Sequence, residues 1–384
     1  METKMNSISI NQVFFDSNNY ILQKGDIYKT VACIRPGNKL LIPKVFAEKI
    51  KSKIIVNNYG HYGIGWTVGW GSVFHAIEIF EKTYPINKEE LVSIIGAGII
   101  GIATAIILLE KGYKNIEIVA DNFENTTSHN SGAYFGLIEV SEEIKKNLLY
   151  KKFIIDSYLA WKEIYERKLF GITRGVTVVD IYLGAQNDVG PQESNIGNEI
   201  LIENKLIEED QPIIITYDNK NFFRMKKNKT FYFNTYEIIE EMYNILKRNN
   251  VIFRKKKIIS IDDETEMGNV IFNCSGLGSR ELNKDLDIYP IVGHLLLLNN
   301  QDTNKNNYVI FCKYLLPEDL STKQYRSFYY MPKNCNNITG ILGGSYVEGY
   351  NGDNEEINNK YFKAILRMAQ HFFSLDFNPQ TLNN

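Results

Sequence analysis

The alternation of hydrophobic and polar positions is clearest in the first third of the chain. Leu91–Ile95 is a continuous apolar run, which is typical of a strand buried inside a parallel sheet. Ile102–Glu110 is apolar almost all round, which predicts a buried helix, and a lysine and a glycine follow it, as at many helix ends. A second apolar run, Ile116–Ala120, precedes Asp121. The pattern therefore predicts a strand, a turn, a helix and a second strand in succession.

Weaker patterns predict further elements on both sides of this unit. A polar connector at Lys82–Glu90 contains a proline and separates the unit from the preceding residues. Apolar positions at helical spacing predict helices at Ser72–Glu81, Ile144–Lys168 and Tyr236–Lys247. Strand-like runs occur at Lys39–Val45, Lys53–Val56, Val251–Arg254, Ile258–Ile261, Val270–Asn273, Gly293–Leu298, Ser327–Met331 and Ile338–Gly343. We expect the last three to form part of a mixed or antiparallel sheet.

Length and composition are those of a globular protein with two domains. The chain has 384 residues, of which 44% are hydrophobic and 23% charged, and its net charge is −2. This charge gives no field that would attract nucleic acid or acidic lipid. The four cysteines are spread out without a CxxC pair, which argues against a disulfide framework or a structural zinc site. No apolar stretch is long enough for a membrane span and no signal-peptide pattern is seen, so we expect a cytoplasmic protein without a metal.

A basic run at Arg254–Lys257 is a local concentration of positive charge. Such a run can bind an anionic partner, but it is more often the solvated edge of a sheet. We favour the second interpretation, so the charge pattern predicts no nucleic-acid partner.

A glycine-rich turn connects the first predicted strand to the buried helix. Its residues are Gly96, Ala97, Gly98, Ile99, Ile100 and Gly101, which fit the GxGxxG pattern of dinucleotide-binding proteins. The first glycine permits the tight turn, the second lets a pyrophosphate approach the backbone, and the third lets helix and strand pack closely. Amide groups and the positive end of the helix then face the phosphates. Asp121 follows the second strand, where its carboxylate can accept hydrogen bonds from ribose hydroxyls.

The motif alone does not distinguish NAD from FAD. The segment Asn125–Gly132 is small, polar and rich in hydroxyl groups, so it could wrap around the diphosphate and ribityl chain of a flavin. An ordinary surface loop of this composition is equally common. The residues by themselves therefore leave both cofactors open.

Several separated segments resemble the D-amino-acid oxidase family of flavoproteins. Val92–Gly101, Val119–Asp121 and Thr126–Ser128 match family motifs in order. Val270–Gly276 resembles the family's strand that ends in NC[TS]G near the cofactor, and Tyr325–Pro332 resembles its substrate-tyrosine segment. The resemblance implies an α/β fold, with an FAD-binding Rossmann-like domain and an α+β substrate domain that contains a mixed or antiparallel sheet.

The order of the segments departs from that of the family. Cys33–Pro36 resembles the family's arginine–proline segment and Asn58–Gly71 resembles its NYGHGGxGxTxxWG signature, although both normally lie near the C-terminus. The simplest interpretation is a circular permutation, in which the usual terminal helix is joined to the usual first strand. It predicts that residues 1–50 and 345–384 are neighbours in space. A further departure is Tyr62-Gly63, where the family has two glycines.

The resemblance also implies roles for individual side chains. Arg35 would bind the substrate carboxylate through its planar guanidinium, and Tyr325 and Tyr329 would bind and enclose the substrate. The backbone carbonyl near Gly63 would accept a hydrogen bond from the amino group, whereas His61 is interpreted as structural. The residues expected to bind FAD are Gly63, Ile64, Gly65, Trp66, Thr67, Gly96, Ala97, Gly98, Ile99, Ile100, Gly101, Asp121, Asn122, Thr126, Thr127, Ser128, Gly132, Ser275 and Gly276.

These expectations combine into one functional hypothesis. Residues 51–140 and 235–285 would form the FAD-binding domain, and residues 1–50, 141–234 and 286–384 the substrate-binding domain. Hydride would pass from the Cα of an amino acid to flavin N5, giving an imino acid and, with oxygen, hydrogen peroxide. The alternatives are a related flavin amine oxidase or dehydrogenase acting on a secondary amine or specialised metabolite, an inactive flavin-fold binding protein, and an NAD-dependent dehydrogenase. The side chain and chirality of the substrate and the formation of homo-oligomers stay open.

Overall fold

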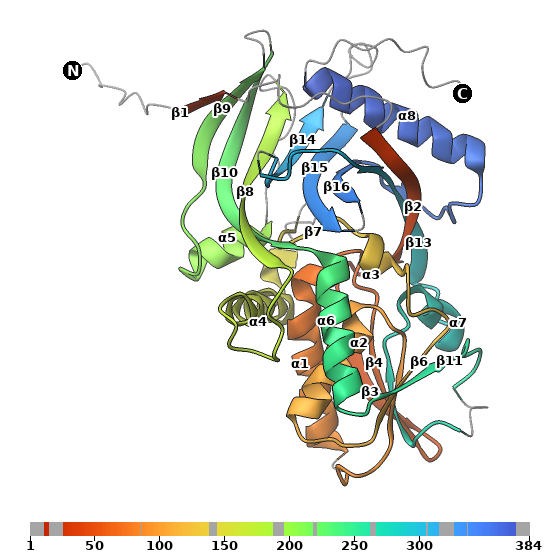
Figure 1. Cartoon of the computed structure of the whole chain (residues 1–384). Coiled ribbons are helices and arrows are strands. Elements are labelled where there is room, and N and C mark those ends of the chain that lie inside the picture. The colour runs from red at the N-terminus through yellow and green to blue at the C-terminus, as the bar shows by residue number, and fades with distance from the viewer. Residues whose placement is uncertain are drawn as a thin grey trace.

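The chain folds around two β-sheets, one in the upper part and one in the lower part of Figure 1. The structure is a computed structural model. It describes residues 11–14, 26–84, 86–137, 144–186, 196–217, 221–261, 266–304, 306–314, 326–335 and 337–373. The mixed α/β fold expected from the sequence is confirmed.

The smaller sheet has six strands in the order β11-β6-β5-β12-β4-β3. Its neighbouring strands are parallel, except for β3 and β4, which are antiparallel. The strands are β3 (Lys44–Ile50), β4 (Lys53–Tyr59), β5 (Val92–Ile95), β6 (Ile116–Ala120), β11 (Ile252–Lys255) and β12 (Val270–Asn273). Together with helix α2 (Ile99–Glu110), β5 and β6 confirm the predicted strand–turn–helix–strand unit.

Helix α2 is the central helix of this part of the molecule. It packs against β5, β6 and β12 and against helices α1 (Gly65–Thr83) and α6 (Thr235–Arg248). All of its residues from Ile99 to Leu108 are buried, which explains why the helix is apolar on every side. Figure 1 shows α1 and α6 beside it.

Helix α1 begins at Gly65, earlier than the predicted start at Ser72. Glycine weakens an isolated helix, so the glycine-rich sequence does not predict these first turns. The glycines instead permit close packing: a Cβ atom on Gly71 would lie 2.3 Å from the Phe153 carbonyl oxygen of helix α4 (Leu148–Tyr165). The Gly71 amide also donates a hydrogen bond to the Ser157 hydroxyl of α4 at 2.7 Å. Tertiary contact with α4 therefore stabilises the start of α1.

The larger sheet has eleven strands and is mainly antiparallel. Its main path is β1-β9-β10-β8-β14-β15-β16-β13-β17, with β2 paired to β13 and β7 paired to β10. The strands are β1 (Asn11–Phe14), β2 (Ile27–Asn38), β7 (Ala133–Tyr134), β8 (Val176–Gln186), β9 (Gln211–Tyr217), β10 (Asn221–Phe233), β13 (Ile288–Leu298), β14 (Tyr308–Tyr314), β15 (Arg326–Cys335), β16 (Ile338–Gly343) and β17 (Val347–Glu348). The remaining helices are α3 (Thr127–Asn130), η3 (Ile144–Lys146), α5 (Ile196–Glu203), η4 (Gly276–Gly278), α7 (Ser279–Leu282) and α8 (Glu355–Phe372).

The two faces of the larger sheet have different partners. In one row of paired residues, Tyr329 lies opposite Gly343, Gly343 opposite Leu295, and Leu295 opposite Val31. Arg35 lies four residues further along β2 than Val31, so its side chain belongs to the same face. Helix α8 covers the opposite face, where it packs against the alternate residues of these strands.

Two predicted strands are wrong. Lys39–Val45 is mostly the connection between β2 and β3, and Leu41 within it has a left-handed backbone conformation (φ 58°), which no strand tolerates. Ile258–Ile261 forms no strand either. Its two end residues pack instead into a small hydrophobic cluster against the smaller sheet. A short apolar run does not by itself distinguish a strand from a loop that contributes to a core.

The expected domain boundary at residue 50 separates two paired strands. Strand β3, which was expected in the substrate-binding domain, pairs along its whole length with β4 of the smaller sheet. The change of sheet therefore lies between β2 and β3. The boundaries at residues 234/235 and 285/286 coincide with changes from one sheet to the other.

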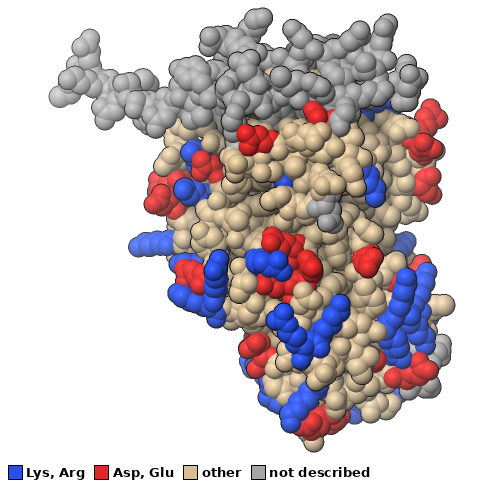
Figure 2. Space-filling model, viewed as in Figure 1, with Lys and Arg blue, Asp and Glu red and all other residues tan. Residues whose placement is uncertain are grey.

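Segments from the two ends of the chain lie side by side in the larger sheet. Strands β2 and β17 both pair with β13, one on each side, and Gly352 lies close to Ala32, so that a Cβ on Gly352 would be 3.5 Å from the Ala32 Cβ. On the face shown in Figure 2, acidic and basic side chains are interspersed. Among the described residues, no helix combines the length and the apolar character needed to cross a membrane.

Candidate functional site

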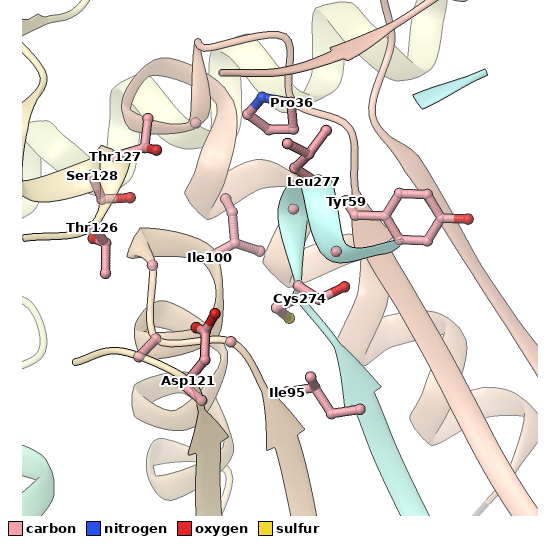
Figure 3. Close-up of a pocket in the computed structure, with 18 of the residues that line it drawn as sticks. Pro36, Tyr59, Ile95, Ile100, Asp121, Thr126, Thr127, Ser128, Cys274 and Leu277 are labelled. Carbon is pink, nitrogen blue, oxygen red and sulfur yellow. The ribbon is translucent and has the colours of Figure 1, made fainter. Parts of the chain in front are cut away.

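A cavity of about 700 Å³ lies at the carboxyl ends of β5, β6 and β12, next to the larger sheet. Its walls come from the turn after β5, the segments after β6 and β12, the end of β2 and the start of α1. Figure 3 shows side chains from these segments around one space. Ligands of open α/β sheets bind at the carboxyl ends of the strands, and the volume is typical of a cofactor site.

Helix α2 presents an open N-terminus to this cavity. Its N-cap residue, Gly98, has an extended backbone (φ −81°, ψ 178°) and no side chain that could cap the helix. No acidic residue occupies the first turn. The Ile99 amide donates to the Ser128 hydroxyl at 3.0 Å, which brings a second polar group to the same place. The positive end of the helix is therefore directed into the cavity, where it favours an anionic ligand.

The other two glycines of the turn are required by backbone contacts. Gly96 has φ 106°, and a Cβ there would lie 2.5 Å from the Cys274 carbonyl oxygen of the segment after β12. A Cβ on Gly101 would lie only 1.9 Å from the Gly96 carbonyl oxygen. Any side chain at either position would displace the turn from the sheet. The turn is thus built for close approach of helix, strand and ligand.

Asp121 lies at the end of β6 and lines the cavity together with Asn122. In Figure 3 its carboxylate rises from the strand end into the cavity, on the side of Thr126, Thr127 and Ser128. A carboxylate at this position can accept hydrogen bonds from ribose hydroxyls, and the three hydroxyl side chains can contact a diphosphate.

The segment that carries these hydroxyl groups is attached to the larger sheet and to helix α1. The Thr127 hydroxyl donates to the Ile34 carbonyl oxygen of β2 at 2.7 Å. The Trp66 indole N–H of α1 donates to the Ser128 carbonyl oxygen at 3.2 Å. A Cβ on Gly132 would lie 2.8 Å from the Met331 sulfur of β15, so this glycine serves the packing of the segment. The cavity wall is therefore fixed by contacts between residues far apart in the sequence.

Most of the residues predicted to bind a cofactor line this cavity. They are Gly63, Gly65, Trp66, Gly96, Ala97, Gly98, Ile99, Ile100, Asp121, Asn122, Thr126, Thr127, Ser128, Ser275 and Gly276. Four others, Ile64, Thr67, Gly101 and Gly132, are not part of the lining. Thr67 is buried and its hydroxyl donates to the Gly136 carbonyl oxygen at 3.0 Å, so its side chain attaches α1 to the segment after α3.

Several residues of the wall were not predicted. Lys256 and Lys257 line the cavity, although the basic run was interpreted only as a sheet edge. The interpretation holds for Arg254, which lies in the edge strand β11 and forms ion pairs with Glu117 at 3.1 Å and Glu266 at 2.8 Å. The pairing of β11 with β6 carries the two lysines towards Asp121. They lie one and two residues after β11, and no local sequence pattern shows that this strand pairs with β6.

His61 is buried and contacts no described group of opposite charge. Its Nε2 lies 2.9 Å from the Ser72 hydroxyl, which itself donates to the Gly69 carbonyl oxygen. Burial lowers the pKa of His61 to about 3, so the ring is neutral near pH 7. These contacts are those of a histidine that joins the loop after β4 to helix α1.

Arg35 lies between the glycine-rich loop and the larger sheet. A Cβ on Gly63 would be 2.6 Å from the Arg35 Cδ, and a Cβ on Gly293 would be 2.8 Å from one of its terminal nitrogens. The guanidinium therefore extends over β13. The Arg35 side chain also lies beside Gly63, which was expected to contact both flavin and substrate. Within the part of the chain that the structure describes, no carboxylate oxygen lies within 4.0 Å of it. A half-buried arginine in this setting favours an anionic ligand.

Only one of the two predicted substrate tyrosines lies in the described part of the chain. Tyr325 lies outside the described residues. Tyr329 is buried on the same face of the larger sheet as Arg35, and its ring stacks on Phe311 with 5.9 Å between the ring centres. A Cβ on Gly343 would be 2.2 Å from the Tyr329 ring, so this ring lies flat over β16.

Successive parts of the cavity fit successive parts of a dinucleotide cofactor. The open helix end and the hydroxyl groups suit the diphosphate, and the Asp121 carboxylate suits a ribose. Gly63, Gly65 and Trp66 form the wall on the other side, where a flat ring system would pass close to backbone without a Cβ in its way. The residues present therefore fit FAD.

Comparison with known proteins identifies the family. The sequence model described as "FAD dependent oxidoreductase" matches residues 92–382, which is well over half of the chain. A D-amino-acid oxidase of Schizosaccharomyces pombe is 26% identical over 286 residues, a match that covers 70% of this chain and 72% of that protein. A D-amino acid oxidase of Dugesia ryukyuensis is 26% identical over 224 residues, covering 54% of this chain and 61% of that protein.

Among solved structures, the chain is weakly similar to a mutant of NikD, described as an unusual amino acid oxidase essential for nikkomycin biosynthesis. It has 10% sequence identity and a TM-score of 0.49, with 73% of this chain and 77% of that chain covered. The family assignment does not depend on this likeness, because the sequence match alone covers most of the chain. The chain belongs to the FAD dependent oxidoreductase family, and it is a flavoprotein oxidoreductase with amino-acid oxidases among its relatives.

Proposed function

We propose that this protein oxidises an amino acid, in the manner of a D-amino-acid oxidase, and that Arg35 holds the substrate carboxylate. The observation that carries the proposal is the position of the Arg35 guanidinium. It lies against Gly63 at the border of the cofactor cavity, without a described carboxylate within 4.0 Å. A planar guanidinium binds a carboxylate through two parallel hydrogen bonds and thereby orients the attached Cα.

The chain's own groups bind, orient and enclose the substrate. Arg35 and Tyr329 share one face of the larger sheet, and the carbonyl near Gly63 is the proposed acceptor for the amino group. Hydride transfer from Cα to N5 is the chemistry that bound FAD supplies, and it leaves an imino acid that water converts to a 2-oxo acid and ammonia. Oxygen is the proposed electron acceptor and would leave as hydrogen peroxide. No side-chain base is needed if the amine enters neutral.

In this proposal the two sheets divide the work. The smaller sheet, with residues 51–140 and 235–285 and with β3 added, forms the FAD-binding domain. The larger sheet, with the remaining residues, forms the substrate-binding domain. The support is the cavity at the carboxyl ends of β5 and β6, where the second wall comes from β2.

We also propose that the chain is a circularly permuted member of its family. The arginine–proline and glycine-rich segments precede residue 92, where the family match begins, yet they form cavity walls together with later residues. Pairing of β2 and β17 with the same strand supports this order. The test is a rearranged chain in which residues 1–90 follow residue 384. It should bind flavin with the same absorbance spectrum, and a rearranged chain that folds without flavin would contradict the proposal.

The function is tested by the absorbance of the purified, flavin-loaded protein during anaerobic mixing with a panel of D-amino acids. Bleaching of the flavin band by at least one of them, followed by peroxide release on admission of oxygen, is the expected result. L-amino acids and N-methylated amino acids provide the comparison. A flavin that no D-amino acid reduces would reject the D-amino-acid assignment, and reduction by an N-methylated amine alone would point to a secondary-amine oxidase.

A further inference from the structure

A carboxylate lies on the same face of the larger sheet as Arg35. In the paired rows of the sheet, Arg35 of β2 is opposite Ile291 of β13, and Ile291 is opposite Glu348 of β17. Residues that are directly opposite project to the same side, so both charged side chains rise from one face, on backbones that lie two strand spacings or about 10 Å apart. The Arg35 guanidinium already extends over β13 towards that side.

Three tyrosines surround Glu348. The hydroxyl groups of Tyr62 and Tyr289 each lie 3.4 Å from the same Glu348 carboxylate oxygen. The ring of Tyr346 packs on the ring of Tyr62, with 5.7 Å between their centres. These four residues, which we call the tyrosine–glutamate group, come from the loop after β4 and from strands β13 and β17 with the residue just before β17.

Tyr62 has a backbone conformation that is costly for a tyrosine. Its φ is 54°, in the left-handed region, where glycine is the least strained residue. Its neighbour Gly63 lies against Arg35, so the loop holds the Tyr62 ring close to the proposed carboxylate site. A strained, half-buried aromatic residue at the border of a site indicates that its side chain is needed there.

The tyrosine–glutamate group has a single formal charge. Burial raises the pKa of Tyr62, Tyr289 and Tyr346, so the three phenols stay neutral near pH 7. Within the described part of the chain, no lysine, arginine or histidine nitrogen lies within 4.0 Å of the Glu348 carboxylate. A carboxylate beside aromatic rings, without a cation of its own, suits an ammonium or guanidinium group through charge and cation–π attraction.

We propose that the tyrosine–glutamate group binds the cationic side chain of the substrate, which makes this protein selective for amino acids with a basic side chain. This inference rests on the proposed function, because Arg35 must hold the carboxylate at the other end of the same molecule. One face of the sheet then presents a cation and an anion, which are opposite in sign to the charges at the two ends of a basic amino acid.

The test compares D-lysine with D-norleucine, which has the same carbon chain without the ammonium group. The flavin-loaded protein is expected to show a kcat/KM at least about 10-fold higher for D-lysine than for D-norleucine. Glu348→Gln should remove most of this preference, because it should lower kcat/KM for D-lysine and leave that for D-norleucine unchanged. Because Glu348 is exposed, the preference should also shrink as salt is raised. Tyr62→Gly, which relieves the backbone strain, should reduce the preference as well.

Glu240→Gln on the exposed side of α6 is the matched control and should leave kcat/KM unchanged for both D-lysine and D-norleucine. The flavin spectrum and thermal midpoint of each variant exclude unfolding as the cause of a loss. Equal or better use of D-norleucine by the unaltered protein would overturn the inference while leaving the proposed function intact. So would a Glu348→Gln variant that keeps its preference for D-lysine. Failure of every amino acid to reduce the flavin would instead reject the proposed function.

Discussion

The side chain of Arg35 lies directly against the backbone of Gly63, so that a Cβ on this glycine would be 2.6 Å from the Arg35 Cδ. Gly63 has φ 83° and borders the cofactor cavity. The contact joins β2 of the larger sheet to the loop after β4 of the smaller sheet. It places the proposed carboxylate ligand beside the proposed flavin wall, although the two residues belong to different sheets.

Replacement of Arg35 by alanine is expected to raise the KM for the amino acid about 100-fold, because a charge-assisted double hydrogen bond is lost. Arg35→Lys should lose less, since it keeps the charge but not the planar geometry. Steady-state kinetics with peroxide detection measure both. Arg248→Ala at the exposed end of α6 is the control. Loss of flavin from Arg35→Ala would mean that this side chain holds the cofactor rather than the substrate.

Gly101→Ala is expected to destabilise the protein by roughly 3 kcal/mol and to abolish flavin binding. Its Cβ would lie 1.9 Å from the Gly96 carbonyl oxygen, so the turn would have to leave the sheet. Denaturant unfolding and the flavin content of the purified protein are the measurements. Gly171→Ala is the comparison, because it has φ 68° but nothing within 4 Å. Gly171→Ala should lower the free energy of unfolding by about 1–2 kcal/mol, and the variant should still bind flavin. A flavin-loaded Gly101→Ala would contradict the packing argument.

His61→Gln should keep kcat within a few-fold, because the ring is neutral and its contact is the Ser72 hydroxyl. The pKa of His61 is lowered by burial to about 3 in the folded protein, against about 6.5 when unfolded. Between these values the unfolded state binds more protons, so folding stability is lost as the pH falls from 6.5 towards 3. The His61→Gln variant should lack this pH-dependent part of the unfolding free energy. Unfolding curves of both proteins at pH 7 and pH 4.5 would detect the difference. A kcat reduced 100-fold or more would assign His61 a role in proton transfer.

Lys333 gives a pH dependence at the alkaline end. It is buried, and its ammonium donates to the Thr235 hydroxyl at 2.6 Å and to the Ser131 carbonyl oxygen at 3.2 Å. Burial lowers its pKa to about 8 in the folded protein from 10.5. The unfolded state therefore binds more protons between pH 8 and 10.5, and this residue makes stability rise over that window, by about 3 kcal/mol in all.

Lys333→Met removes this titration. The difference in unfolding free energy between the unaltered protein and the variant should therefore change in favour of the unaltered protein from pH 7.5 to pH 10. Denaturant unfolding at the two pH values measures it, and the subtraction cancels the tyrosines that titrate in the same range. A difference that stays constant would show that Lys333 keeps its proton in the folded state, through its partners and the nearby Tyr236 ring.

Local patterns in the sequence determined the strand–turn–helix–strand unit of the smaller sheet. The strand, turn, helix and strand at residues 91–121 follow from a continuous apolar run, three glycines and a second apolar run, and the structure contains them. Gly96 and Gly101 were predictable because the clash that a side chain would cause involves the turn and the strands it joins. Asp121 was predictable because it follows a parallel strand.

Tertiary structure alone decided what the segments far apart in the sequence do together. The early start of α1 does not follow from its glycine-rich sequence, since its glycines pack against the other helices, Gly71 against α4 and Gly69 against α2. Lys256 and Lys257 reach the cavity because β11 pairs with β6, and no local pattern encodes that pairing. The same holds for Arg35 and Glu348, 313 positions apart, which share a face because both strands pair with β13. Strand register is a property of the assembled sheet, so the chemistry that depends on it appears only after folding.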